Sequence, residues 1–369
     1  MRVFVSAGEA SGDHLAASLI RAMSAASPGA VFWGMGGHES ENCGMEVAWP
    51  SEALQLMGIG EVLGSIPRLL KLKNAISARI ATEKPDAVIV VDSPDFHFPL
   101  LRQVRREGYR GCIVYLAPPQ VWAWRRGRTA FLRETCDLCL PLFDFEHEFL
   151  AMEGVRSAWA GHPFVDEFGG PAKPAGPGIE NRQVALLPGS RKTEVERILP
   201  VLLQTARLLL AKGYEPVFSI APGLAGSERE RLLSRLSGFR TDERGGRTLM
   251  GESGCVVGAS GTAAVEAMML DRFMVVLYRV SLSSELVFRC FVRTPYVSIP
   301  NRLAGCAVYP ELLQGKANPG AIMEVLEGYL SGVTRSSVHE SLERARSRMG
   351  RPGAAGFWAR SILESMGRS

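Results

Sequence analysis

Short apolar runs alternate with longer amphipathic stretches along most of the chain. The first half predicts strands at Val3–Ala7, Ala30–Trp33, Ala87–Val91, Cys112–Leu116, Leu138–Leu142 and Ser157–Ala160. The second half predicts strands at Val184–Leu187, Pro216–Ile220, Cys255–Ala259 and Phe273–Tyr278. Helices are expected at Glu194–Leu210, Ser227–Leu236, Thr262–Leu270, Ser336–Met349 and Phe357–Met366. Because strands that alternate with helices pair in parallel through right-handed crossovers, the pattern predicts an α/β protein with parallel sheets.

The alternation breaks once, at the Gly- and Pro-rich stretch Gly169–Gly178. Such a composition forms neither a helix nor a central strand, so it predicts an interdomain linker. The expected divisions are a first domain at 1–168, a linker at 169–182, a second domain at 183–345 and a terminal helical segment at 346–369. Two similar α/β halves are expected to enclose a cleft, and ligands bind such sheets at the carboxyl ends of their strands.

Composition and charge narrow the class of protein. The chain has 369 residues with a net charge of +4, so an anionic partner must meet a local patch and no nucleic acid is expected. Glu9 comes too early for a signal peptide, no run of 18 apolar residues exists, and seven cysteines indicate reduced thiols in the cytoplasm. Cys136 and Cys139 form a lone C-x-x-C without a second ligand pair, which favours a buried strand over a metal site.

An aromatic segment follows the predicted strand Cys112–Leu116. Pro118 and Pro119 impose an extended or turning backbone, and Trp122 and Trp124 lie just before Arg125. Aromatic faces beside guanidinium groups suit a sugar, a base or an anionic lipid. The alternative is two core tryptophans at the start of a basic helix.

The first predicted strand leads into a glycine-containing turn and then a helix. Gly8 and Gly12 allow a ligand to approach the backbone closely, and a helix N-terminus favours anions. The spacing does not match the G-x-G-x-x-G dinucleotide fingerprint. The alternative is a plain helix start capped by Ser11 or Asp13, with His14 in a structural role.

The buried run Ala87–Val91 ends in two carboxylates, Asp92 and Asp95. Catalytic groups in α/β domains lie at this end of a strand, and Asp92 is placed to accept a proton from a hydroxyl. In the alternative reading both aspartates only cap or turn the chain.

Two strand-to-helix turns in the second half favour a pyrophosphate. The first holds Gly189, Ser190 and Arg191, and the pattern from Thr193 to Glu196 predicts a capping box. Backbone N–H groups and a guanidinium bind pyrophosphate well, although the P-loop spacing is absent.

The second of these turns consists of small residues, Ser260, Gly261 and Thr262, followed by Glu266, a carboxylate suited to ribose hydroxyls. The alternative is a small-residue helix packed tightly on a sheet, with Glu266 as a solvated charge.

The segment 56–73 combines an apolar surface with Arg68, Lys71 and Lys73. It suits a membrane interface or an acyl groove, whereas a core-facing amphipathic helix is the alternative.

Together these motifs resemble one family, the lipid-A-disaccharide synthases, which are inverting glycosyltransferases of the GT-B fold. The matching stretches are SAGEASGD at 6–13, MGIGEVLG at 57–64, VDSPDF at 91–96, VWAWR at 121–125, GHP at 161–163, LLPGSR at 186–191, ASGTAAVE at 259–266, YVSIPNRLAG at 296–305 and PELLQ at 310–314. Two departures are mild: residues 142–146 stand where the family usually has Pro-Phe-Glu, and residues 34–37 replace a Gly-Gly-Pro type of turn.

The resemblance implies two Rossmann-like domains that face each other across a cleft, with a C-terminal helix that crosses back to the first. It implies transfer of 2,3-diacylglucosamine from UDP-2,3-diacylglucosamine to the 6-hydroxyl of lipid X, without a cofactor or a metal. It also implies a cytoplasmic enzyme in peripheral contact with anionic lipid of the inner membrane, and leaves a homodimer open.

Roles for single residues follow from the same resemblance. Asp92 is the expected base, with Glu9 and His14 beside it on the acceptor side. The expected UDP-binding residues are Gly189, Ser190, Arg191, Ser260, Gly261, Thr262, Glu266, Asn301, Glu311 and Gln314. The expected acceptor or lipid side comprises Ser11, Asp95, Trp122, Trp124, Arg125, Arg68, Leu69, Leu70 and Leu72.

Two rival classes remain at this point. One is another GT-B enzyme acting on UDP-GlcNAc, either a 2-epimerase or the undecaprenyl-linked GlcNAc transferase. The other is a non-catalytic protein that binds acylated sugars. UDP release that requires both lipid substrates distinguishes the synthase from each of them.

Overall fold

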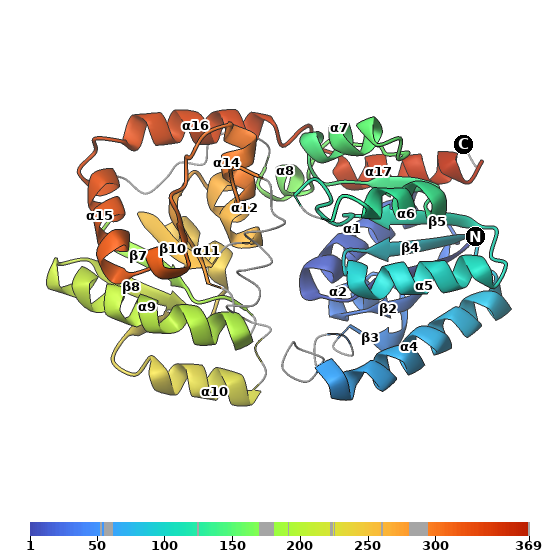
Figure 1. Ribbon diagram of the computed structural model, residues 1–369, viewed down its shortest axis with the longest axis horizontal. Helices are drawn as coiled ribbons and strands as arrows, with labels where there is room; N and C mark the ends of the chain where they lie inside the picture. The colour runs from blue at the N-terminus through green and yellow to red at the C-terminus, as the bar shows by residue number, and fades with distance from the viewer. Residues whose placement is uncertain are drawn as a thin grey trace. The chain divides into compact units, whose positions relative to one another are not determined.

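Two compact units make up the chain, and each is an α/β sandwich (Figure 1). The computed structural model describes residues 1–51, 54, 62–123, 125–169, 181–190, 192–221, 224, 226–259, 261–279 and 294–367, with only the backbone of 62–66. The first unit comprises Met1–Asp166 and Gly350–Ser369, and the second comprises Glu167–Met349. The predicted linker lies almost wholly at 170–180, outside the described residues.

The first unit is built on a parallel sheet in the order β3-β2-β1-β4-β5-β6. Its strands are β1 (Arg2–Ala7), β2 (Val31–Gly36), β3 (Glu46–Pro50), β4 (Ala87–Val91), β5 (Cys112–Leu116) and β6 (Leu138–Leu140). Its helices are α1 (Ala10–Ala26), α2 (His38–Asn42), α4 (Val62–Glu83), α5 (Pro94–Arg106), α6 (Arg128–Thr135), α7 (Asp144–Met152), α8 (Phe164–Glu167) and α17 (Ala354–Ser365).

The second unit is built on a parallel sheet in the order β12-β11-β10-β7-β8-β9. Its strands are β7 (Gln183–Leu187), β8 (Glu215–Ser219), β9 (Arg240–Asp242), β10 (Cys255–Ala259), β11 (Phe273–Tyr278) and β12 (Glu311–Leu313). Its helices are α9 (Lys192–Ala211), α10 (Gly226–Arg235), α11 (Gly246–Glu252), α12 (Thr262–Met269), α14 (Ile299–Ala304), η1 (Gln314–Lys316), α15 (Pro319–Leu330) and α16 (Arg335–Ser347).

Both sheets follow the same doubly wound plan. Starting from the first strand of each unit, the chain fills one side of the sheet and then returns to fill the other. The order therefore reverses between β1 and β4 in the first unit and between β7 and β10 in the second. Ligands of such sheets bind beyond the carboxyl ends of the strands at this switch point. The α/β architecture with parallel, Rossmann-like sheets that was predicted from the sequence is confirmed.

The first sheet is buried on both faces, which explains its nearly continuous apolar strands. On β1, Val3 and Val5 contribute to one core cluster together with α1 and α17, whereas Phe4 points into the opposite cluster. Every residue of β4 is fully buried. Polar residues begin at the ends of the strands, so these ends are the part of the sheet that is open to the outside.

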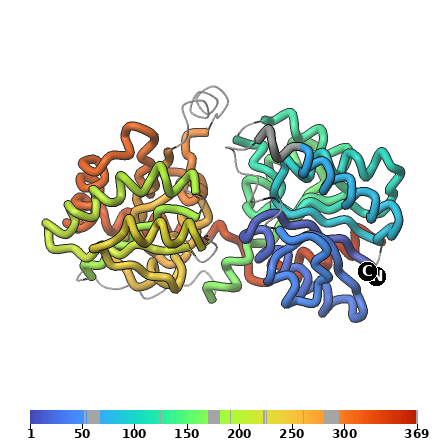
Figure 2. The backbone as a smooth tube through the Cα atoms, turned by 90° about the horizontal axis from the view of Figure 1, so that it is seen from below, coloured from blue at the N-terminus to red at the C-terminus, as the bar shows by residue number. Residues whose placement is uncertain are grey.

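Helix α17 packs on α1 in the first unit, so the predicted return of the C-terminal helix is confirmed. Figure 2 shows this C-terminal segment, in red, beside the blue N-terminal segment. Trp358 and Ile362 are fully buried in the cluster that also holds Val3 and Val5. The helix therefore completes the core of the first unit.

Several element predictions need correction. Ser157 makes only an isolated bridge to Cys139, so no strand covers Ser157–Ala160, and β6 ends at Leu140. Three strands were not predicted: β3, β9 and β12. All three lie at sheet edges and carry Pro, Arg, Asp or Glu, so they lack the apolar run on which the prediction depended.

Candidate functional site

The switch point of the first sheet brings two predicted motifs together. Ala7 pairs with Val91 in the β1–β4 register, so Gly8 and Asp92 follow neighbouring strand ends. A Cβ atom on Gly8 would lie 2.7 Å from the Ser93 Oγ and 2.5 Å from the Leu54 Cδ1, so a larger residue would have to displace these side chains. The sequence prediction of a site at this edge of the sheet rested on these two motifs alone, without any contact between them.

Asp92 has an unusual backbone conformation. Its φ is 50°, and Ser93, the N-cap of α5, has φ 46° and ψ 54°. The left-handed region costs non-glycine residues about 1–2 kcal/mol each, so two in succession need support. The Asp92 carbonyl oxygen accepts hydrogen bonds from His97 Nδ1 at 2.6 Å and from the Tyr115 hydroxyl at 2.7 Å. Asp92 itself is partly buried at the end of β4.

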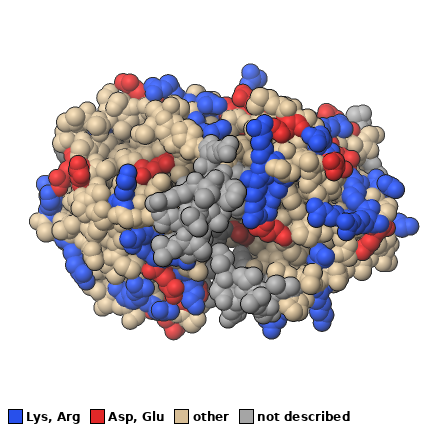
Figure 3. All heavy atoms as spheres, in the orientation of Figure 1, with Lys and Arg blue, Asp and Glu red and all other residues tan. Residues whose placement is uncertain are grey.

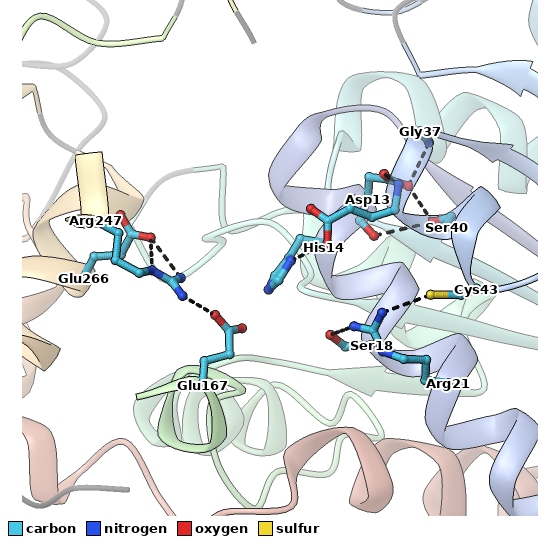
Figure 4. Close-up of polar contacts among 11 residues, drawn as sticks. Asp13, His14, Ser18, Arg21, Gly37, Ser40, Cys43, Glu167, Arg247 and Glu266 are labelled. Carbon is cyan, nitrogen blue, oxygen red and sulfur yellow. Dashed lines mark hydrogen bonds and ion pairs between the residues drawn. The ribbon is translucent and has the colours of Figure 1, made fainter. Parts of the chain in front are cut away.

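The start of α1 differs from the predicted cap. The helix begins at Ala10 with Glu9 as N-cap, and no side chain caps it. Ser11 is exposed, whereas Asp13 is buried and bonds the start of α2. Figure 4 shows its carboxylate accepting hydrogen bonds from the Gly37 N–H at 2.7 Å and from the Ser40 hydroxyl. The cap predicted for Ser11 or Asp13 is thus wrong, because Asp13 serves a neighbouring helix.

His14 lies on α1 one residue after Asp13. Its Nδ1 is 2.8 Å from the Glu39 Oε2, and its side chain is 33% exposed. A histidine oriented by a carboxylate has the geometry of a general base as well as of a structural ion pair.

Asp95, at the start of α5, forms ion pairs with two arginines. Its carboxylate is 78% exposed, pairs with Arg125 at 3.3 Å and forms a closer ion pair with Arg128. Arg125 is part of the predicted aromatic segment, so the structure brings the two acceptor-side motifs into contact.

Trp122 is anchored from within the first unit. Its Nε1 donates to the Glu146 carboxylate at 3.1 Å, and its ring meets Phe145 edge-on at 5.2 Å. Glu146 is buried and also accepts from the Leu142 N–H. Trp124 lies outside the described residues. The contacts of Trp122 favour structural support of this loop.

The second switch point lies at the ends of β7 and β10, where Leu187 pairs with Gly258. Gly189 follows β7 with φ 107°, and a Cβ there would lie 2.1 Å from the Glu194 Oε2. The Ser190 N–H donates to the Glu194 carboxylate at 3.2 Å. Helix α9 already begins at Lys192, so the capping box predicted from Thr193 to Glu196 is wrong, and Glu194 reaches back instead. Arg191 lies outside the described residues.

Helix α12 starts beside this turn. Gly261 is its N-cap with φ 146°, a Cβ on it would meet nothing within 4 Å, and both Gly261 and Thr262 are exposed. The first N–H groups of a helix have no partner one turn earlier and can bind an anion, although in α12 the Ala264 N–H already donates to the Gly261 carbonyl at 3.1 Å. Ser260 lies outside the described residues.

Glu266 belongs to an ion-pair cluster in the second unit. Its carboxylate meets Arg247 of α11 at 3.0 Å, and Arg247 also contacts Glu167 at 2.8 Å (Figure 4). The Glu266 side chain is only 18% exposed. Glu266 itself lies within α12, and the ion pair with Arg247 restrains its carboxylate. Arg247 was missed from the sequence because no motif surrounds it.

The motif at 296–314 forms a hydrogen-bonded loop. Asn301 is fully buried and bonds both the N–H and the carbonyl of Tyr309 at 2.7 Å. The Glu311 carboxylate accepts from Asn301 and from the N–H groups of Val297 and Ser298. These side chains therefore shape the loop. Gln314 follows with φ 51° at the start of η1.

The described side chains of α4 divide between two faces. Leu69 and Leu72 pack against the core cluster of the first unit, whereas Leu70 is 49% exposed and Arg68 and Lys71 are exposed. Of the three leucines predicted to face lipid, Leu69 and Leu72 therefore face the core instead, as the alternative of a core-facing helix expects. Most of the motif at 57–64 lies outside the described residues.

Comparisons with known proteins decide the family. The model of the family "Lipid-A-disaccharide synthetase" matches residues 3–354. The chain belongs to this family. It is 37% identical to the lipid-A-disaccharide synthase of Myxococcus xanthus over 98% of this chain and 97% of the relative. It is 38% identical to the one of Azotobacter vinelandii over 94% and 96%.

Solved structures support the fold. A putative UDP-N-acetylglucosamine 2-epimerase from Listeria monocytogenes is 15% identical, with a TM-score of 0.64 over 98% of this chain and 94% of that one. The calicheamicin glycosyltransferase CalG4 is 13% identical, with a TM-score of 0.60 over 98% of both chains. At these identities the likeness establishes the GT-B architecture alone. Family membership gives lipid-A-disaccharide synthase activity in lipid A biosynthesis, and the epimerase and binding-protein alternatives are set aside.

Hydropathy and surface charge can be followed over the described part of the chain. Across the described part of the chain, none of the helices combines the length and apolarity needed to cross a bilayer. Acidic and basic side chains are interspersed on the face shown in Figure 3.

Proposed function

We propose that the chain transfers 2,3-diacylglucosamine from UDP-2,3-diacylglucosamine to the 6-hydroxyl of lipid X, 2,3-diacylglucosamine 1-phosphate. Family membership implies these two substrates. The products are the β-1,6-linked disaccharide 1-phosphate and UDP. The observation that carries the assignment of roles is the place of Asp92, which follows the strand at the switch point of the first sheet.

Asp92 acts as the general base. The acceptor hydroxyl gives its proton to the Asp92 carboxylate while its oxygen attacks the anomeric carbon, and the bond from that carbon to the UDP oxygen breaks on the opposite face. This path inverts the anomeric centre through an oxocarbenium-like state. A base in this position contributes about 10²–10⁴-fold to the rate. Glu9 and His14 shape the acceptor side.

The second unit binds UDP. The negative charge that develops on the leaving pyrophosphate is stabilised by N–H groups at the start of α12 and by Arg191, whereas the Ser190 N–H is already bonded to Glu194. The Glu266 carboxylate receives the ribose hydroxyls. The remaining residues assigned to this side are Gly189, Ser260, Gly261, Thr262, Asn301, Glu311 and Gln314. Support comes from the exposed N-terminus of α12 and from the buried contacts that hold the loop at 296–314.

The first unit receives the acceptor and the lipid. Ser11, Asp95, Trp122, Trp124 and Arg125 line or support the acceptor side. The outward face of α4, with Arg68 and Leu70, meets anionic lipid at the cytoplasmic face of the inner membrane, and Leu69 and Leu72 hold the helix on the core. The homodimer stays an open proposal, tested by the mass of the protein in solution.

The test is UDP release by purified protein given each substrate alone and then both, with and without EDTA. Release only with both substrates, with a disaccharide detected by mass spectrometry, is the expected result. Release from the donor alone would instead indicate a hydrolase or an epimerase, and loss of activity with EDTA would overturn the metal-free reading.

Asp92→Asn tests the base, because it keeps the size of the side chain and removes its proton affinity. The expected loss in kcat is about 10²–10⁴-fold. His14→Ala is the matched comparison, since the ion pair between His14 and Glu39 makes His14 the second candidate base. Near-normal turnover of Asp92→Asn, with activity abolished in His14→Ala, would assign the proton transfer to His14.

A further inference from the structure

A chain of buried polar groups ends on the backbone of Asp92. His97 lies on α5, its side chain is fully buried, and its Nδ1 is 2.6 Å from the Asp92 carbonyl oxygen. Its Nε2 is 2.8 Å from the hydroxyl of Ser6, which is also fully buried on β1. A carbonyl oxygen only accepts, so Nδ1 carries the proton, and Nε2 accepts from Ser6.

A second donor meets the same oxygen. The Tyr115 hydroxyl on β5 lies 2.7 Å from it, and Tyr115 is fully buried. Burial lowers the pKa of His97 from 6.5 to about 4 and raises the pKa of Tyr115 well above its usual value. The imidazole therefore stays neutral and the phenol stays protonated at neutral pH, so both donors are permanent.

These donors act on a strained peptide unit. Asp92 and Ser93 both have positive φ angles, and two hydrogen bonds to the carbonyl between them resist relaxation to an ordinary conformation. The direction of the Asp92 Cα–Cβ bond depends on this backbone conformation. Relaxation would therefore move the carboxylate, and a misplacement of about 1 Å at a reacting group costs about 100-fold in rate.

We propose that His97, anchored by Ser6 and assisted by Tyr115, is a positioning residue that holds the Asp92 carboxylate in place for proton removal. The inference rests on the proposed role of Asp92 as the base. His97 touches no reacting atom, and its effect reaches the substrate only through Asp92.

A double-mutant cycle tests this route. The four proteins are the wild type, Asp92→Asn, His97→Leu and the double variant, each measured for kcat, for KM with both substrates and for thermal unfolding. We expect His97→Leu to lower kcat about 100-fold with each KM within about threefold, and to lower kcat less than about twofold further in the Asp92→Asn background. His97→Asn, whose amide N–H replaces the Nδ1 donor, is expected to recover kcat to within about fivefold.

Tyrosine variants provide a second measurement if His97→Leu does not fold. Tyr115→Phe removes one donor from the Asp92 carbonyl, and about a tenfold loss of kcat is expected. Tyr109→Phe is the matched control, because Tyr109 is also buried and donates to a backbone carbonyl, that of Pro85, before β4 begins. Equal kcat for the two tyrosine variants would overturn the proposal.

The outcomes separate the two proposals. The positioning role would be refuted if His97→Leu lowered kcat by the same factor in the wild type and in the Asp92→Asn background, or if it changed KM alone. Either result would leave the role of Asp92 as the base unaffected. Normal turnover of Asp92→Asn would refute the base itself, whatever His97→Leu does.

Discussion

The two sheets have the same strand order and the same switch point, yet they present different chemistry there. In the first unit the strand end carries a carboxylate, and buried His97 and Tyr115 fix the backbone of Asp92 from behind. In the second unit the strand ends lead into glycine turns, and Gly261 and Thr262 are exposed. Buried side chains support the switch point of the first sheet, whereas the backbone at the switch point of the second sheet is exposed to solvent.

Topology therefore sets where a site lies in each unit, and the side chains behind the strand ends set what the site can do. A general base must be held at a fixed angle to a hydroxyl, so support from neutral buried donors is useful. A pyrophosphate carries its own charge and can be bound by N–H groups at a helix start, which need no side chain and only room to approach.

The first prediction tests the buried support and has the largest expected effect. The pKa of His97 is about 4 in the folded protein and 6.5 in an ordinary environment, so the unfolded chain takes up a proton that the native state refuses. The stability from neutral His97 is fully present above pH 6.5 and is lost as the pH falls toward 4. The expected loss is about 3 kcal/mol, at about 1.4 kcal/mol per unit of pKa.

Urea unfolding of the wild type and His97→Asn between pH 7 and pH 4 measures this loss. Asparagine does not titrate, so the variant is expected to show a shallower decline, while carboxylates contribute equally to both proteins. A decline of the same steepness in the variant would mean that the His97 imidazole accepts a proton in the folded state without cost.

The second prediction concerns the exposed switch point. Glu266→Gln removes the charge that is proposed to receive the ribose hydroxyls, and one charge-assisted hydrogen bond corresponds to about a tenfold rise in KM for the UDP-sugar. The kcat is expected to stay within about threefold, because the ribose lies away from the bond that breaks.

Glu252→Gln is the control for Glu266→Gln. Glu252 lies on α11 of the same unit and also pairs with an arginine, Arg244, but it belongs to no proposed ligand contact. If both variants raise KM equally, the effect is a general consequence of lost ion pairs, and Glu266 has no specific role.

The sequence predicted the strands around both sites well, because each buried apolar run ends abruptly at polar or glycine residues. Strands β4, β5, β10 and β11 were predicted to the residue, and with them the positions of Asp92 and Gly261. The supporting contacts were not predictable in the same way. His97 stands in the apolar stretch after VDSPDF, and nothing local shows that its ring reaches both Ser6 and the Asp92 carbonyl.

Asn301 shows that a motif alone does not reveal what a side chain contacts. Its motif marks it as a nucleotide-side residue, but its side chain is buried and bonded to Tyr309 and Glu311. A motif identifies positions that a family needs, and only the fold distinguishes a residue that touches a ligand from one that shapes the loop. The same ambiguity affected Asp13, whose carboxylate serves α2.

The last and smallest expected effect concerns the proposed contact of the first unit with anionic lipid. Arg68 and Leu70 lie on the outward face of α4 in the first unit, and Arg207 is also exposed, on α9 of the second. Arg68→Gln is expected to weaken binding to vesicles with anionic lipid about fivefold, since one basic residue near such a surface contributes about 1 kcal/mol. Leu70→Ser is expected to weaken it about threefold through lost apolar burial.

Salt separates the two contributions, because screening at high ionic strength removes the effect of Arg68→Gln and leaves that of Leu70→Ser. Co-sedimentation with vesicles at low and high salt measures both. Arg207→Gln is expected to bind as the wild type does, which would assign the lipid-facing surface to the unit that carries Asp92. Equal weakening by Arg68→Gln and Arg207→Gln would instead indicate a diffuse attraction of the whole basic chain, and the division of roles between the two units would then not extend to the membrane.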